Sequence, residues 1–508
     1  MLRRALLASL FAALLVAPAR ATWSIVVVDR RTGEVAVGAA TCIQRINLLS
    51  GLPTLVPGVG AGVIQASGDS SDLLAMTAGF RMGLSPADIL VLVQAAEPSV
   101  AQLQTGIVAL YPGAPVTFTG RTVGRAKAGV VGEVGDLAYA IQGNVLAGVE
   151  VVTAAETALL TARGDLSQRL MAAMVAAREL GGDGRCSCDF GRPDRCGAPP
   201  ASFEKSAHVG FVVVARIGDE VPPCAQPSGN DCSQGRFHLR LNIRGADASM
   251  NSPDPVDQLV DLYAQWRAER AGRPDGLLST VDAPDSIPAD GRTKRSVTVQ
   301  LVDLEGVPLR RGGARVTVEP ATGRPLAEVG PVLDLGDGRY RFALYSTTRV
   351  GTERLVIRAE DELVRATLHP YLELRSEPPA ALHVGVDELS ASAGGSAPFL
   401  LARPDFPGAR YVILASAATA PPSRLPPFGT VPLVQDRWFQ LALQHAGDAR
   451  LLPGMLGTLD AAGRAEGAFH APPGALVGLI GRRLWWAALL SDGRRAAVTG
   501  AVSFAVVP

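Results

Sequence analysis

The sequence predicts an α+β fold at its beginning, an αββα sandwich, followed by two all-β regions, an immunoglobulin-like domain and a C-terminal β-sandwich module. Two observations support this prediction. Within residues 22–270, strand patterns come first, helical patterns follow, and a further strand and helix end the run, which suits two packed sheets with helices outside. From residue 296 on, short alternating strands separated by turn residues replace the helical patterns. The order of elements in the first region also fits other α+β folds.

Two apolar strands open the first region, at residues 24–29 and 34–41, and a tight turn containing Gly33 joins them. Both strands are apolar on both faces, as strands covered on both sides should be. Further strands are predicted at residues 58–64, 105–110, 116–119, 137–142 and 207–216. Helices are predicted at residues 72–82, 85–96, 149–162, 166–180 and 256–269.

Changes in composition set the predicted domain boundaries. The first domain spans residues 22–272, and the Pro-, Asp- and Gly-rich residues 273–295 lack periodicity, which predicts a linker. Alternating residues over 296–376 predict the immunoglobulin-like domain. A second Pro-rich break precedes the C-terminal module, residues 382–508. Its strands are expected near residues 411–416, 438–443 and 484–490.

The first 21 residues have the three parts of a secretory signal peptide. Arg3 and Arg4 supply the positive start, residues 5–16 form an apolar run, and residues 19–21 (Ala-Arg-Ala) form a small-residue cleavage site. We therefore expect a secreted or periplasmic protein. Lys plus Arg equal Asp plus Glu at 48 each, so charge gives no reason to expect nucleic acid as a partner. No later apolar run is long enough to predict a membrane span.

Six cysteines are unevenly distributed, five of them in one Gly- and Pro-rich stretch. They are Cys42, Cys186, Cys188, Cys196, Cys224 and Cys232. Because an exported chain is oxidised, the sequence predicts disulfides, with at least two bridges inside the cluster. Zinc is the alternative, but Cys186-x-Cys188 is closer than the usual ligand pair. The connectivity stays open, and the odd number implies that Cys42 joins the cluster or one thiol is free. No metal and no cofactor are expected.

Thr22 is the strongest candidate for chemistry, because cleavage after residue 21 would make it the first residue. A free α-amino group titrates near pH 7.7–8.0, so part of it is neutral and accepts the proton of the adjacent hydroxyl. A threonine with a free amine that leads into a buried strand is typical of the start of an N-terminal-nucleophile (Ntn) hydrolase. Ser24, two residues along, is the fallback nucleophile but lacks the amine.

Seven segments, taken in order, resemble a bacterial family known as domain of unknown function 1028, which is placed among the Ntn hydrolases. They are TWSIV (22–26), GEVAVG (33–38), QAS (65–67), IQGNVLAG (141–148), GGDGR (181–185), KSAHV (205–209) and DPVDQL (254–259). The resemblance covers residues 22–270 and implies an Ntn fold with Thr22 in the nucleophile position, without an established reaction. The Lys that proteasome-like members place near their Thr is absent here. From residue 389 on, the chain looks like a β module that ends many exported planctomycete and myxobacterial proteins.

Five further residues are candidates for the site. Asn144 follows a strand and could donate to a tetrahedral oxyanion, although a turn Asn that holds its own backbone has the same pattern. Gln65 ends a Gly-rich strand and could orient substrate, or could be a satisfied sheet-edge residue. Asp183 and Arg185 flank a Gly-rich turn, where the Arg could clamp a substrate carboxylate or form a solvated helix end. His208 is a further candidate base on a predicted strand.

Two functions remain from the sequence alone. In the first, an exported amidohydrolase, Thr22 attacks an amide or γ-glutamyl carbonyl, its amine acts as base, Asn144 stabilises the intermediate, and water releases the acyl group. In the second, a catalytically silent Ntn-like domain binds peptide or cell-wall fragments, and the β domains are adhesion modules. The cleavage site favours the first function, and the lack of a charged partner for Thr22 favours the second. The sequence specifies no oligomeric state.

Overall fold

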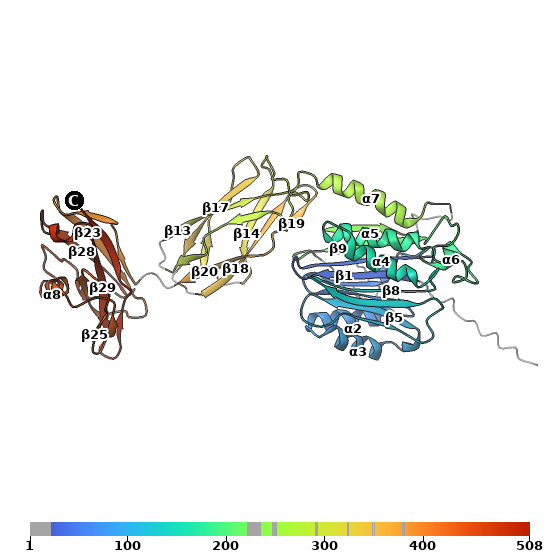
Figure 1. The fold of residues 1–508 in the computed structure, drawn as a ribbon, viewed down its shortest axis with the longest axis horizontal. Coiled ribbons are helices and arrows are strands. Elements are labelled where there is room, and N and C mark those ends of the chain that lie inside the picture. Colours follow the sequence, from blue (N-terminus) through green and yellow to red (C-terminus); the bar gives the residue numbers. More distant parts are fainter. Residues whose placement is uncertain are drawn as a thin grey trace, which may run out of the picture.

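A computed structural model describes residues 22–220, 235–245, 251–289, 293–322, 325–347, 349, 351–377 and 381–508. The predicted signal peptide, residues 1–21, lies outside the described residues, as do Cys224 and Cys232. The sheets form three groups that follow one another along the chain (Figure 1). None of the helices in the described ranges is long and apolar enough to cross a membrane.

The first group contains two antiparallel sheets. The larger has the strand order β10-β9-β2-β1-β8-β7 and the smaller the order β3-β4-β5-β6. The strands of the larger sheet are β1 (Thr22–Asp29), β2 (Glu34–Thr41), β7 (Ala128–Val134), β8 (Leu137–Asn144), β9 (Val209–Ala215) and β10 (Leu239–Ile243). Those of the smaller sheet are β3 (Pro53–Val56), β4 (Gly60–Ala66), β5 (Leu103–Ala109) and β6 (Val116–Thr119). The sequence does not predict β3, β7 or β10.

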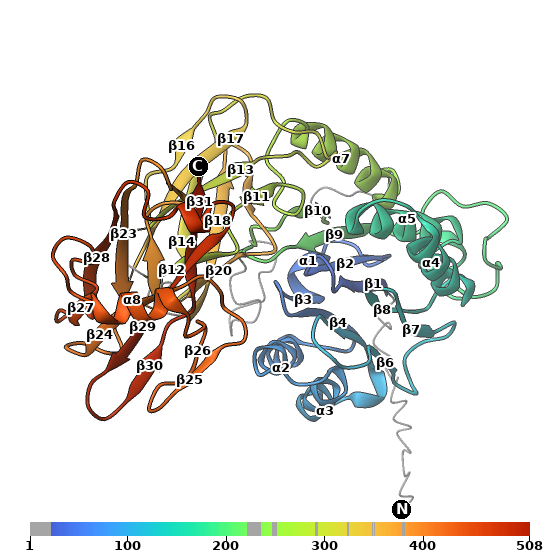
Figure 2. The ribbon, with the colours of Figure 1, turned by 60° about the vertical axis from the view of Figure 1, so that its left-hand side comes forward.

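Helices cover the outer faces of both sheets, so that four layers follow one another as helices, sheet, sheet and helices (Figures 1 and 2). The larger sheet carries α4 (Glu150–Thr161), α5 (Leu166–Glu179) and α7 (Pro255–Arg270). The smaller sheet carries α2 (Ser70–Arg81) and α3 (Pro86–Ala96). All five lie within two residues of their predicted bounds. The short helices are α1 (Leu48–Gly51), η1 (Val100–Gln102) and α6 (Gly184–Ser187).

Strand β1 lies at the centre of this stack, and each of its residues is buried. Side chains alternate between the two faces of a strand. Trp23 and Ile25 pack in the core that contains residues of α4 and α5, whereas Val26 packs against the smaller sheet. Thr22 and Ser24 therefore share the face of Val26, between the two sheets.

Helix α2 begins beside a buried pair of carboxyl groups. The Asp72 side chain accepts a hydrogen bond from the Asp69 N–H at 2.9 Å and completes a capping box. Asp72 and Glu97 are 0% and 5% exposed. Burial, together with the neighbouring Glu97 carboxyl, raises the pKa of Asp72 to about 7.

We expect this pair to make the protein less stable as the pH rises. An unfolded Asp titrates near pH 4, so the folded form binds a proton more tightly than the unfolded chain between about pH 4 and pH 7. The free energy of unfolding should therefore fall across this interval, and Asp72→Asn should remove that part of the fall. Denaturant unfolding of both proteins at several pH values measures the difference. Equal falls in the two proteins would contradict the shifted pKa.

The second group is a pair of facing sheets around one apolar core that includes Phe342, Ile357 and Leu374. The first sheet consists of β11 (Thr280–Asp282), β13 (Lys294–Gln300), β15 (Ala327–Val329), β16 (Leu333–Asp334) and β17 (Arg339–Ser346). The second consists of β12 (Ser286–Pro288), β14 (Arg315–Pro320), β18 (Gly351–Glu360), β19 (Arg365–Thr367) and β20 (Leu372–Glu377). Since β11 and β12 lie within residues 273–295, the prediction of a linker there is wrong. Strands of three residues are too short to show alternation.

The third group surrounds a core that includes Phe399, Phe469 and Trp486. Its strands are β21 (Leu382–Val384), β22 (Glu388–Ser390), β23 (Gly395–Ala402), β24 (Arg410–Ser416), β25 (Ser423–Leu425), β26 (Gly429–Val431), β27 (Leu456–Thr458), β28 (Arg464–Ala471), β29 (Arg483–Ser491), β30 (Ala496–Val498) and β31 (Val502–Val507). The remaining elements are η3 (Val477–Leu479) and helix α8 (Arg437–Gln444). The strand predicted at 438–443 is thus wrong. The Asp436 side chain accepts the N–H groups of two following residues and starts a helix there.

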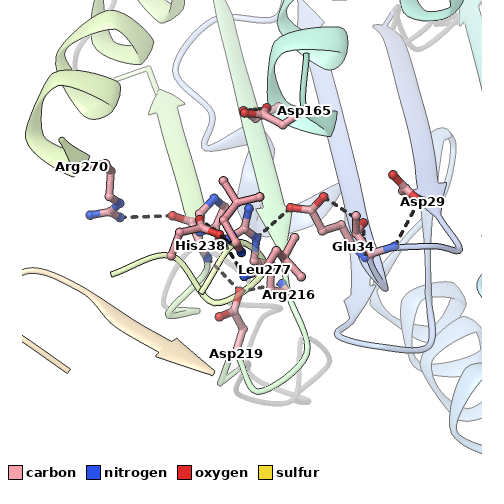
Figure 3. Close-up of polar contacts among 12 residues, drawn as sticks. Asp29, Glu34, Asp165, Arg216, Asp219, His238, Arg270 and Leu277 are labelled. Atoms are coloured by element: carbon pink, nitrogen blue, oxygen red, sulfur yellow. Dashed lines mark hydrogen bonds and ion pairs between the residues drawn. The ribbon is translucent and has the colours of Figure 1, made fainter. Parts of the chain in front are cut away.

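A buried ion-pair cluster joins the first group to the second (Figure 3). Arg216, which follows β9, donates to Glu34 at 2.8 Å and to Asp275 at 2.6 Å. The side chains are 11% exposed for Arg216 and 3% for each carboxylate. Asp219 accepts the N–H groups of Arg216 and His238, each at 2.8 Å. Because Glu34 begins β2 and Asp275 precedes β11, Arg216 connects the two groups of sheets.

Candidate functional site

The residues predicted to carry chemistry meet at one end of the two sheets of the first group. Thr22 opens β1 and pairs with Asn144, the last residue of β8. Gln65, near the end of β4, donates from Nε2 to the Thr22 carbonyl oxygen at 3.1 Å. Asp183 and Arg185 lie at the same end, beside the last residue of β2. The Arg216 cluster lies at the other end of β2, where Arg216 contacts Glu34.

Between the sheets, buried amide side chains form a network with the Ser24 hydroxyl. Gln65 Nε2 donates to Gln104 Oε1 at 2.6 Å, and Asn144 Nδ2 donates to the same oxygen at 2.9 Å. Gln142 Nε2 donates to Ser24 Oγ at 2.7 Å, and this hydroxyl donates to Gln65 Oε1 at 2.8 Å. All five side chains are at most 4% exposed. The network therefore fixes the orientation of each amide beside the start of β1.

These contacts limit what each residue can do. Ser24 is fully buried and uses its hydroxyl both as donor and as acceptor, so it does not replace Thr22 as nucleophile. Gln65 directs its amide nitrogen to two partners within the protein. Asn144 is different, because its Oδ1 is buried and has no hydrogen-bond partner among the described residues. A buried acceptor without a donor costs free energy and requires an explanation.

Asp183 and Arg185 form a buried ion pair at this end of the sheet. Arg185 Nη2 lies 2.8 Å from Asp183 Oδ2, and its Nε lies 3.1 Å from Oδ1, with the side chains 7% and 0% exposed. The Cys42 N–H also donates to Asp183 Oδ2, at 2.7 Å. The carboxylate that Arg185 clamps thus belongs to the protein itself. The pair is neither a solvated helix end nor a substrate clamp in this arrangement.

Two disulfides hold the loops around the site, Cys42–Cys186 and Cys188–Cys196. The prediction of disulfides is confirmed for the described cysteines, of which none is free. Only Cys188–Cys196 lies inside the predicted cluster. The other bridge joins the cluster to Cys42, at the end of β2, which is one of the two alternatives that the odd count left open.

His208 lies beside the first of these disulfides. One of its ring nitrogens and the sulfur atoms of Cys42 and Cys186 lie within 4.8 Å of one another. The two sulfur atoms are bonded to each other, so they are not available as thiolate ligands. Burial lowers the pKa of His208, and its Nε2 lies 3.2 Å from Gln44 Nε2. His208 therefore lies beside this disulfide, directly before β9, and β2 separates β9 from β1.

The backbone is strained next to two of the candidate residues. Val145, directly after Asn144, has φ 54°, and Ala66, directly after Gln65, has φ 73°. Both lie in the left-handed region, which a β-branched residue such as Val145 rarely adopts. Strained backbone of this kind concentrates at active sites, where surrounding contacts hold it. The observation favours a functional role for this end of the sheets.

A pocket of about 200 Å³ opens beside Thr22. Its lining combines the start of β1, the end of β4 and the loop with α1 that follows β2. The lining residues are Thr22, Ile43, Ile46, Asn47, Leu48, Gly51, Leu52, Ile64, Gln65, Ala66 and Gly68. The candidate nucleophile therefore has a cavity beside it, and no charged side chain lines that cavity.

Sequence reasoning missed Gln104, Gln142 and the pocket. A signal for the two glutamines was present, because each lies in a strand that is mostly apolar. A polar side chain in a strand covered on both faces needs a partner. The pocket had no such signal, since its walls combine two strand ends with a loop and the short helix α1, which only the folded chain brings together.

The described fold is an αβ region of four layers followed by two regions of β-sheet. Residues 22–188 match the model of a family of unknown function, DUF1028, which confirms the resemblance inferred from the sequence for this part of the chain. Residues 277–367 match the model of Invasin, domain 3. That match lies in the second group of sheets, and neither model extends to the third. No curated protein matches the chain.

Solved structures similar to the chain include a DUF1028 protein and bacterial adhesins. The DUF1028 protein from Silicibacter pomeroyi has 19% identity and a TM-score of 0.34, over 48% of this chain and 88% of that one. The Yersinia pseudotuberculosis adhesin InvE has 17% identity and a TM-score of 0.21, over 46% and 60%. The Escherichia coli adhesin FdeC has 9% identity and a TM-score of 0.19, over 96% and 97%.

Proposed function

We propose that this protein is an exported amidohydrolase of the Ntn type whose nucleophile is Thr22. The observation that carries the proposal is the position of Thr22. It directly follows the predicted signal-peptide cleavage site, opens the central strand, and lines a pocket. The four layers of the first region and the match to DUF1028 support the Ntn assignment. The two disulfides support export into an oxidising compartment, secreted or periplasmic.

In this proposal, removal of residues 1–21 frees the α-amine of Thr22. The neutral amine takes the hydroxyl proton while Oγ attacks the amide carbonyl carbon, giving a tetrahedral intermediate. The intermediate collapses as the carbon–nitrogen bond breaks and the ammonium returns its proton to the leaving amine. Water, deprotonated by the same amine, then hydrolyses the acyl ester on Oγ and regenerates Thr22. The chemistry uses no cofactor.

Asn144 holds the new amine in the proposed site. Its buried Oδ1 has no donor within the part of the chain that the structure describes, and its strand position pairs with that of Thr22. An α-amine freed by cleavage supplies N–H groups at this position. Asn144 thus takes a positioning role instead of the oxyanion role predicted from the sequence. Gln65 holds the Thr22 carbonyl through its amide nitrogen, so it orients the nucleophile and not the substrate.

The alternative is a binding or adhesion protein whose Ntn-like region is silent and recognises peptide or cell-wall fragments. The match of residues 277–367 to Invasin, domain 3, favours it. The absence of a charged side chain in the pocket lining is compatible with both functions, because the base proposed here is the α-amine itself.

A one-residue extension tests the proposal. Protein that begins at Thr22 should hydrolyse simple 4-nitroanilide amides, whereas protein that begins at Ala21 should not, because its free amine lies one residue away from the hydroxyl. Both proteins keep every side chain of the site, so they serve as matched controls for folding. Equal hydrolysis by the two would exclude the amine as base. No hydrolysis by either, with retained binding of peptide or cell-wall fragments, would favour the alternative.

A further inference from the structure

The pocket beside Thr22 is lined mostly by apolar residues, and none of its lining residues is charged. Five branched aliphatic side chains contribute to it, and its polar side chains are uncharged. The aliphatic residues are Ile43, Ile46, Leu48, Leu52 and Ile64. The polar side chains are those of Thr22, Asn47 and Gln65. A group that binds here leaves water for an apolar surface, which favours hydrocarbon and penalises charge.

The buried Asp183 and Arg185 at this end of the sheet are already paired. Asp183 and Arg185 bind each other through two contacts, and Asp183 also accepts the Cys42 N–H. If either residue bound a substrate instead, its partner would stay buried without a counter-charge, which is strongly unfavourable. A γ-glutamyl group carries an α-ammonium and an α-carboxylate at its far end. None of the residues that line the pocket offers an opposite charge to either one. The exposed residues Arg45 and Asp69 are next to lining residues in the chain but are not part of the lining.

The size of the pocket limits its occupant. Sites for drug-sized ligands usually measure about 300–1,000 Å³. The volume here is about 200 Å³, which suits one side chain or a short acyl chain. Ile64 also packs with apolar residues of the helices α2 and α3, so the core holds this side of the pocket in place.

We propose that the pocket binds a short, uncharged aliphatic group of the substrate, next to the carbonyl that Thr22 attacks. The part of this inference that concerns hydrolysis rests on the proposed function, whereas the part that concerns binding in the pocket does not. It narrows the substrate class to short aliphatic acyl amides and excludes γ-glutamyl amides.

Gly51 allows the pocket to be narrowed without disturbing the core. It lines the pocket and is exposed, and a Cβ added there meets no heavy atom within 4 Å. Gly51→Leu should therefore fold normally and fill the opening. Gly500→Leu is the matched control, since a Cβ at that position also meets nothing within 4 Å, in the third group of sheets. Gly68 is unsuitable, because its Cβ would meet Ile64.

The experiment compares acetyl, butyryl, hexanoyl and γ-glutamyl 4-nitroanilides. Turnover is measured with protein that begins at Thr22, and binding with its Thr22→Ala variant by calorimetry. We expect butyryl to exceed γ-glutamyl by about tenfold or more in kcat/KM and in affinity. Gly51→Leu should lower the affinity for the butyryl and hexanoyl compounds by about tenfold and change the affinity for the acetyl compound by no more than about twofold. The control Gly500→Leu should not show this loss of affinity.

The two readouts separate the two proposals. Binding of butyryl that Gly51→Leu weakens, without turnover by the Thr22 protein, would support the pocket and contradict the hydrolase. Preference for γ-glutamyl in either readout would overturn the inference. Unchanged chain-length preference in Gly51→Leu, or no binding of any alkanoyl compound, would also overturn it.

Discussion

Thr22→Ala, in protein that begins at residue 22, should reduce amide hydrolysis by about a thousandfold or more. The variant keeps the α-amine but removes the oxygen that attacks the carbonyl, and the Ser24 hydroxyl, the nearest alternative, is buried with both of its hydrogen-bonding roles used. Thr22→Ser keeps both the hydroxyl and the amine. It should retain activity within about one order of magnitude. Comparison of Thr22→Ala with Thr22→Ser therefore measures the contribution of the hydroxyl alone.

The loss in Thr22→Ala should not come from unfolding. The substitution removes a hydroxyl and a methyl group from a strand end, and we expect the free energy of unfolding to change by about 1–2 kcal/mol at most. Circular dichroism and denaturant unfolding of both variants check this. Activity of Thr22→Ala equal to that of the unaltered protein would contradict the mechanism.

Arg216→Met should lower the free energy of unfolding by about 3–5 kcal/mol, the second large effect that we expect. The substitution leaves the carboxylates of Glu34 and Asp275 buried without their cation, at 3% exposure each. It also separates β2 of the first group from the residues that lead into β11. The expected result is an unfolding transition of the first two groups of sheets at clearly lower denaturant concentration.

The control for Arg216 is an arginine whose ion pair lies at the surface. Arg236 is 78% exposed in its side chain, and its nitrogen lies 3.9 Å from Glu220. Arg236→Met should therefore change stability by about 1 kcal/mol or less. Equal effects of Arg216→Met and Arg236→Met would show that the buried cluster does not hold the regions together.

The long helices and central strands could be predicted because local signals and tertiary packing agree in them. Ser85 and Pro86 begin α3 as the sequence indicates, and β1 and β2 are apolar on both faces. Strands β11 and β12 could not, because three residues show no period. Helix α8 was predicted as a strand, since the Asp436 cap that starts it was not taken into account.

The candidate residues of the site could be selected from the sequence, but their contacts could not. Thr22 and Asn144 stand at the ends of predicted strands. Their approach to Gln104 depends on how the two sheets stack, which no local pattern encodes. For the same reason, the sequence could not distinguish an Arg185 that binds substrate from one that binds Asp183.

The most direct test of the account is to locate a covalent acyl group by mass spectrometry. Exported protein is incubated with an activated butyryl ester, digested, and its N-terminal peptide is sequenced by fragmentation. The account predicts that this peptide begins at Thr22 and carries one butyryl group on the Thr22 oxygen. A mature chain that begins at another residue, or a butyryl group on any residue other than Thr22, would contradict it.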